Sequence, residues 1–143
     1  MKKCVLIFLV YCFSLTVISC GTKDNTSDNT STASSTFSDN GTTFTVTVNS
    51  SKYYIDGILT KSLILKKGYT YYFYSTDLTT NNHPLFIGTT SSGGSYTYEY
   101  TSGVTNSRTT TATLTFIVPS DSPSTLYYNC GEHESMGGSI TIN

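Results

Sequence analysis

The chain of 143 residues has no tryptophan, only three prolines and only two histidines, and 12% of its residues are charged. Eight Lys and Arg stand against nine Asp and Glu, a balance that argues against nucleic-acid binding. Pro and Gly are too few for a collagen-like chain. The sequence also lacks Gly-x-Ser-x-Gly, phosphate-loop and His-Glu-x-x-His motifs. These absences, with a length that suits one domain, favour a single-domain protein that is not an enzyme.

Serine, threonine and tyrosine dominate what is present. The sequence holds 21 Ser, 27 Thr and 12 Tyr, a composition that favours β-strands over long helices. Apolar residues alternate with polar ones, or form short runs that end at turn residues, in eight segments: 44–48, 63–65, 69–74, 85–87, 96–100, 112–116, 126–128 and 139–142. The pattern predicts an all-β fold, a Greek-key β-sandwich or barrel of seven to nine strands.

The N-terminus has the features of a targeting segment. Lys2 and Lys3 precede an apolar run over residues 5–18, which has the length of a secretory signal and is short for a transmembrane span. The run ends at Ser19-Cys20 and resembles a bacterial lipoprotein signal, in which the cysteine is acylated. An uncleaved anchor and an ordinary secretory signal are the alternatives. We therefore predict a signal peptide over 1–19, lipidation at Cys20, and a protein that leaves the cytoplasm.

The segment that follows Cys20 is rich in Ser, Thr, Asn and Asp and shows no periodicity. Such a segment cannot bury enough apolar surface to offset its chain entropy. We predict a disordered tether over 20–42 and a folded domain over 43–143. The lipid would anchor this domain to a bacterial membrane in the cell envelope, with the domain facing the periplasm or the exterior.

One thiol remains in the predicted domain. Cys4 and Cys12 lie in the signal segment and Cys20 is the predicted lipidation site, so Cys130 has no disulfide partner within the mature chain. A lone thiol in an exported protein is exposed to oxidation unless something binds or protects it.

Cys130 begins the pattern Cys130-x-x-His133-x-x-Met136 on a predicted loop between two strands. The other histidine, His83, comes just before a predicted strand. Thiolate and thioether are soft ligands that favour copper or zinc, and imidazole suits both metals. A His₂Cys set with a weak axial Met is the donor set of blue-copper electron-transfer sites. The spacing therefore makes these four residues candidate ligands.

Residues 43–143 resemble the cupredoxins, or type 1 blue copper proteins, and the Cys-x-x-His-x-x-Met spacing is like that of amicyanin. Further motifs match a subgroup of extracellular and phage-associated domains: Tyr54-Ile55-Asp56-Gly57, Leu63-x-Leu65-x-x-Gly68-x-Thr70-Tyr71, His83-Pro84-Leu85, Leu126-Tyr127-Tyr128-x-Cys130 and Met136-Gly137-Gly138. The resemblance implies one type 1 copper ion, with His83, Cys130 and His133 as equatorial ligands and Met136 as the axial ligand. It also implies single-electron transfer between redox partners.

The resemblance implies two further properties of the site. The second histidine of the family is exposed to partners, so His133 is the expected electron port. Glu132 and Glu134 flank it and predict a basic redox partner. In many cupredoxins the residue after the first histidine donates its backbone N–H to the cysteine sulfur. Pro84 has no N–H, which predicts a lower reduction potential unless another donor, such as Asn81 or Asn82, replaces it.

Other interpretations compete with the copper site. A zinc site normally has four strong ligands, for which Met136 is a poor candidate. Cys130 taken alone would more often be a buried core residue. Glu132 and Glu134 could suggest acid–base catalysis, but loop carboxylates of this kind are more often solvated charges. The alternative of a different class is a copper-free or copper-storing module with a structural or adhesion role.

The tyrosines at 96, 98 and 100 alternate along one predicted strand face. Such a stripe could form a sugar-binding platform. Packing on the face of a strand is the more ordinary role, because aromatic residues are common strand formers.

Overall fold

The computed structural model describes residues 42–143. The predicted signal peptide over 1–19, the lipidation site Cys20 and the tether up to residue 41 lie outside the described residues. Ten strands form the described part: β1 (Thr42–Asn49), β2 (Lys52–Ile55), β3 (Ile58–Leu59), β4 (Leu63–Leu65), β5 (Thr70–Tyr74), β6 (Leu85–Gly88), β7 (Val104–Thr105), β8 (Thr113–Ile117), β9 (Thr125–Cys130) and β10 (Gly138–Ile142). One 3₁₀ turn, η1 (Leu78–Thr80), lies between β5 and β6.

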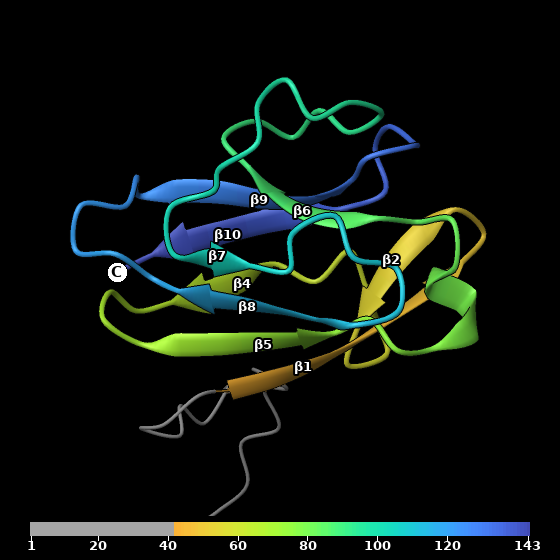
Figure 1. Ribbon diagram of the computed structural model, residues 1–143, viewed down its shortest axis with the longest axis horizontal. Coiled ribbons are helices and arrows are strands. Elements are labelled where there is room, and N and C mark those ends of the chain that lie inside the picture. The colour runs from red at the N-terminus through yellow and green to blue at the C-terminus, as the bar shows by residue number, and fades with distance from the viewer. Residues whose placement is uncertain (1–41) are drawn as a thin grey trace, which may run out of the picture. The chain divides into compact units, whose positions relative to one another are not determined.

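The strands form two sheets that pack face to face (Figure 1). One sheet has the order β3-β2-β1-β5-β8-β7 and the other has the order β4-β10-β9-β6. β1 pairs with β5, and β4 with β10, in parallel, while the remaining pairs are antiparallel. The all-β sandwich predicted from the sequence is confirmed.

Alternation along the strands places the core between the sheets. β1 buries Phe44 and Val46, and β5 buries Tyr71 and Phe73 beside them. The intervening side chains of these strands point outward, because successive residues of a strand face opposite sides. Leu126, Tyr128 and Cys130 of β9 enter the same core from the second sheet. The buried cluster is continuous without any disulfide among the described residues.

The strand count exceeds the predicted seven to nine because β3 and β7 have two residues each and pair only at the sheet edges. Segments this short carry too few residues to show alternation. β2 was represented in the sequence only as part of a family motif.

The predicted strand over 96–100 is wrong. Residues 89–103 form a long loop, with a single isolated bridge between Glu99 and Gly88. Tyr96 packs edge-on against Phe86, Tyr98 is exposed, and Tyr100 packs against Phe116. The three tyrosines therefore do not share a face, and the sugar-binding platform loses its basis.

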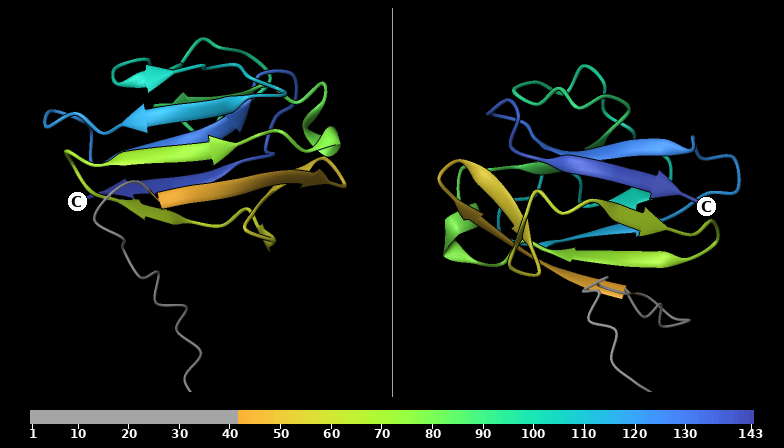
Figure 2. Two further views of the ribbon diagram at one scale, coloured as in Figure 1. Left: turned by 60° about the horizontal axis from the view of Figure 1, so that its bottom comes forward. Right: turned by 180° about the vertical axis from the view of Figure 1, so that it is seen from behind.

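The loop over 89–103 covers the outer face of β6 and β9 (Figures 1 and 2). Leu85 and Ile87 of β6 belong to the main core, while Phe86 lies outside that cluster and packs against Tyr96, so all four residues of the strand are buried. Asn129 is also buried on this outer face, and its side-chain amide donates to the Thr90 carbonyl at 2.9 Å. A strand covered on both faces loses the alternation that identifies half-buried strands.

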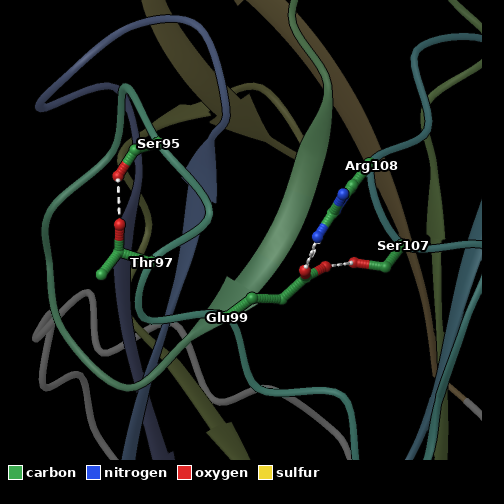
Figure 3. A network of polar contacts seen from close by, with 5 residues as sticks. All are labelled: Ser95, Thr97, Glu99, Ser107 and Arg108. Atoms are coloured by element: carbon green, nitrogen blue, oxygen red, sulfur yellow. Dashed lines mark hydrogen bonds and ion pairs between the residues drawn. The ribbon is translucent and has the colours of Figure 1, made fainter.

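An ion pair fixes the far end of this loop. Arg108 contacts Glu99 through two hydrogen bonds, of 3.0 and 2.6 Å, and Ser107 donates to the same carboxylate (Figure 3). Burial opposes ionisation of Glu99, but the hydrogen bonds from Arg108 and Ser107 outweigh it and lower its pKa. The Arg108 guanidinium also lies 4.1 Å from the centre of the Tyr96 ring. These contacts tie the loop to the segment between β7 and β8, where the Arg108 N–H donates to the Leu85 carbonyl of β6.

Within residues 42–143, no helix has the length and apolar character needed to cross a bilayer.

Candidate metal centre

The pairing of β6 with β9 places two of the predicted ligands at one end of the sandwich. Leu85 stands opposite Cys130 in this antiparallel pair. His83 lies two residues before Leu85, and the Gly131 N–H extends the ladder by donating to the Pro84 carbonyl at 2.9 Å. The register of this strand pair therefore brings His83 close to Cys130, although the two residues are 47 positions apart in the sequence.

The loop between β9 and β10 brings the chain back over this end. Ser135 has a φ of 57°, in the left-handed region. A Cβ on Gly137 would lie 1.6 Å from the Tyr128 carbonyl oxygen, so only glycine allows the two backbones to approach this closely. The loop over 131–137 is short and closely packed, and it carries His133 and Met136.

His83, Cys130 and His133 meet in a group whose ligand atoms all lie within 4.8 Å of one another. The Cys130 sulfur is 3.9 Å from His83 Nδ1 and 3.6 Å from His133 Nδ1. A metal bonded to nitrogen at about 2.05 Å and to sulfur at about 2.3 Å, as zinc is, separates these atoms by about 3.8 Å in a trigonal site. The two observed distances bracket that value, so the residues fit a bound ion of this size.

The three residues differ in exposure. Cys130 is fully buried in the core, His83 is half-buried, and His133 is exposed. Burial lowers the pKa of His83, and the nearby His133 lowers it further. Both effects favour the neutral form of His83, which is the form that binds metal.

Met136 lies on the same loop and is buried, with 1% of its surface exposed. It belongs to the core cluster that contains Cys130. Among the described residues, the group contains no fourth histidine, cysteine or carboxylate. The role of Met136 as the axial ligand stays a prediction.

Glu132, Glu134 and Ser135 surround His133 and are all exposed. A surface hollow beside His133 is lined by Asn82, Pro84, Thr110 and Glu132. The two carboxylates, which flank His133 in the sequence and together are called the acidic rim, are both exposed, as solvated charges are.

Sequence reasoning missed two residues that shape this site. Gly131 has no room for a side chain, because a Cβ there would lie 2.1 Å from the Tyr96 hydroxyl. Tyr53, from β2 in the other sheet, donates its hydroxyl to the His83 carbonyl at 2.7 Å. The motif Tyr54-Ile55-Asp56-Gly57 next to Tyr53 is a sequence signal for this region, but it does not indicate the hydrogen bond from Tyr53 to His83.

The two-sheet sandwich, with one histidine before a strand and the remaining group on the loop between the last two strands, is the arrangement that the resemblance to the cupredoxins implies. The described domain is an all-β sandwich of two sheets, and its His₂Cys group has the donor types that type 1 copper sites use.

No protein-family model matches the chain, and no curated protein shows significant similarity to it. Among solved structures, the chain is similar to reduced rusticyanin, at 12% identity and a TM-score of 0.45, covering 75% of this chain and 82% of that chain. It is also similar to rusticyanin from Thiobacillus ferrooxidans, at 12% identity and a TM-score of 0.42, covering 75% and 80% of the two chains. These similarities are weak, and the assignment of the site rests on the chain's own residues.

The close approach at Gly137 generates a prediction. We expect Gly137→Ala to destabilise the fold by about 3 kcal/mol, because the added methyl meets backbone atoms that cannot rotate away. Gly57→Ala is the control: that glycine has a φ of 77° with open space around it, and its substitution should cost about 1 kcal/mol of conformational strain. Urea unfolding of the two variants measures both losses. Equal losses would contradict the proposed role of Gly137.

Proposed function

We propose that this protein is a copper-dependent carrier of single electrons in the cell envelope. The observation that carries the proposal is the group of His83, Cys130 and His133, which gathers one cysteine sulfur and two imidazoles at metal-binding separations. The copper ion, when bound, would supply one-electron chemistry by alternating between Cu(I) and Cu(II).

The chain's own residues supply the surroundings of that ion. Cys130 would hold it from the buried side, where the core excludes water and protects the thiol from oxidants. His83 and His133 would hold the ion with their imidazole nitrogens, and the Met136 thioether would be a weak further donor. Protein would cover the ion on the Cys130 side, and only the His133 imidazole would be exposed on the other side. This arrangement suits a site that exchanges electrons but does not bind a substrate.

His133 is the proposed electron port, because it is the exposed member of the group. The rim of Glu132 and Glu134 would attract a partner with a basic surface and would repel an acidic one. The partner is proposed by its charge alone. The same carboxylates would favour the more positive ion, Cu(II), and so lower the reduction potential.

A carrier is favoured over an enzyme because the sequence holds two histidines and both belong to this group. A copper enzyme that oxidises a substrate usually needs further metal sites, and no histidine remains to build one. The alternative is a copper-free or copper-storing module with a structural or adhesion role. The spectrum of the copper-loaded protein separates the two functions.

The attachment to the envelope is proposed from the sequence. A signal peptide over 1–19 and acylation at Cys20 would leave the tether over 20–42 between the lipid and the domain over 43–143. One acyl chain gives only marginal membrane binding, so stable anchoring would need more than one chain at this site.

The first test of this function is the spectrum with copper. We expect Cu(II) added to the purified protein to produce an intense visible band from charge transfer between the Cys130 thiolate and copper, and Cys130→Ala to abolish it. Met136→Leu should keep the band and raise the reduction potential, since it removes a donor that favours Cu(II). A wild-type protein without the band would favour the structural or adhesion role. A coloured Cys130→Ala protein would exclude Cys130 as a ligand.

The acidic rim predicts how electron exchange depends on salt. Exchange of the wild-type protein with a cationic redox reagent should slow as ionic strength rises. The Glu132→Gln, Glu134→Gln double variant should lose most of this dependence. Asp121→Asn is the matched control, because Asp121 is exposed but lies before β9, at the other end of the strand that ends at Cys130. Stopped-flow rates measure the effect, and a salt dependence unchanged in the double variant would contradict the proposed port.

Cys20→Ser tests the anchor. We expect the variant to remain unprocessed or to appear in the soluble fraction, because the acylated thiol would be missing. Membrane fractionation and the mass of the N-terminal peptide measure the change. Cys12→Ser, which alters a cysteine of the same predicted leader, should leave both unchanged. Wild-type fractionation and mass in Cys20→Ser would contradict lipidation.

A further inference from the structure

Tyr53 joins the two segments that carry the candidate ligands. Its side chain is fully buried, and its hydroxyl donates to the His83 carbonyl oxygen at 2.7 Å. Its backbone N–H donates to the Met136 carbonyl oxygen at 2.9 Å. Tyr53 of β2 therefore bonds to the backbone of both segments that carry candidate ligands. It lies in the sheet opposite to that of β9, the strand that ends at Cys130.

These contacts satisfy two backbone carbonyl groups at the site, those of His83 and Met136. His83 and Met136 both lie outside regular strands, so their carbonyl groups lack ladder partners. A buried hydroxyl without a partner is costly, and so is a buried carbonyl without one. The Tyr53 hydroxyl and the His83 carbonyl satisfy each other, and movement of the hydroxyl would remove this partner from the carbonyl.

Pro84 makes this contact more important. Because proline lacks an N–H, the residue after His83 cannot tie its segment to Cys130 through a backbone donor. Only the Pro84 carbonyl bonds to the chain next to Cys130, by accepting a hydrogen bond from the Gly131 N–H. The Tyr53 hydroxyl holds the preceding carbonyl, that of His83, so the segment is fixed on both sides of the proline bond.

We propose that Tyr53 is a positioning residue that fixes the His83 segment relative to Cys130 and Met136 before any metal binds. The hydroxyl stays neutral in this role. Burial raises the pKa of Tyr53, and the neighbouring Cys130 side chain raises it further through its charge and a hydrogen bond.

Hydrogen exchange of the metal-free protein tests the proposal. Tyr53→Phe removes one hydroxyl and keeps the ring. We expect the amides of His83, Leu85 and Gly131 to exchange about tenfold faster in this variant, the change that losing one hydrogen bond to the segment would cause. The amide of residue 53, which donates to Met136, should remain protected.

Tyr128→Phe is the matched control. Tyr128 is equally buried, its ring centre lies 6.3 Å from that of Tyr53, and its hydroxyl donates to the Lys61 carbonyl at 2.9 Å. Its loss should speed exchange around Lys61 and leave His83 and Gly131 unchanged. Amides in the middle of β5 and β8 serve as the internal reference for global unfolding.

Three outcomes would overturn the proposal. In the first, Tyr53→Phe leaves exchange at His83 and Gly131 within twofold of wild type. In the second, Tyr53→Phe raises exchange in β5 and β8 as much as at these amides. In the third, Tyr128→Phe raises exchange at His83 and Gly131 as much as Tyr53→Phe does. The second outcome would make Tyr53 a general core residue.

A second measurement rests on the proposed copper site. If copper leaves through opening of the His83 segment, its release to a chelator should be about tenfold faster in Tyr53→Phe than in wild type or Tyr128→Phe. Equal release rates would overturn the role of Tyr53 toward the metal. A wild-type protein that binds no copper would overturn the proposed function, while the exchange experiment on metal-free protein would still decide whether Tyr53 positions His83.

Discussion

The antiparallel pairing of β6 with β9 is the contact on which the candidate site depends. It sets Leu85 opposite Cys130, and through this register it fixes how far His83 lies from the sulfur. A shift of one residue would turn Cys130 away from the core and bring Asn129 into it. Both strands are covered on the inner face by the other sheet and on the outer face by the loop over 89–103. The register is therefore held by burial on two sides.

The site combines a rigid buried half with an exposed half. Cys130 belongs to the hydrophobic core, so packing holds its side chain in place as it holds those of Leu126 and Tyr128. His133 lies on a loop of seven residues, 131–137, bounded by a close backbone approach at Gly137. Such a division would suit the proposed electron exchange, because a fixed set of candidate ligands limits rearrangement while one exposed member would allow contact with a partner.

Alternation predicted the long strands and failed where tertiary contacts override it. Phe44 and Val46 of β1, like Tyr71 and Phe73 of β5, follow the inward and outward pattern that the sequence displays. The tyrosines at 96, 98 and 100 show the same period but do not form a strand. Tyr96 instead covers Phe86 beneath the Arg108 side chain. A sequence period cannot distinguish a strand from a loop whose aromatic residues pack in different directions.

The sequence by itself determined the all-β class, the spacing of Cys130, His133 and Met136, and His83 as the other histidine available for a ligand group. These features follow from residue type and local spacing, which need no knowledge of distant contacts. Only the tertiary structure decided that His83 reaches Cys130, that His133 is the exposed member of the group, and that Tyr53 bonds to both ligand segments. Each depends on strand register and on the packing of one sheet over the other, which bring together residues that are 30 to 83 positions apart.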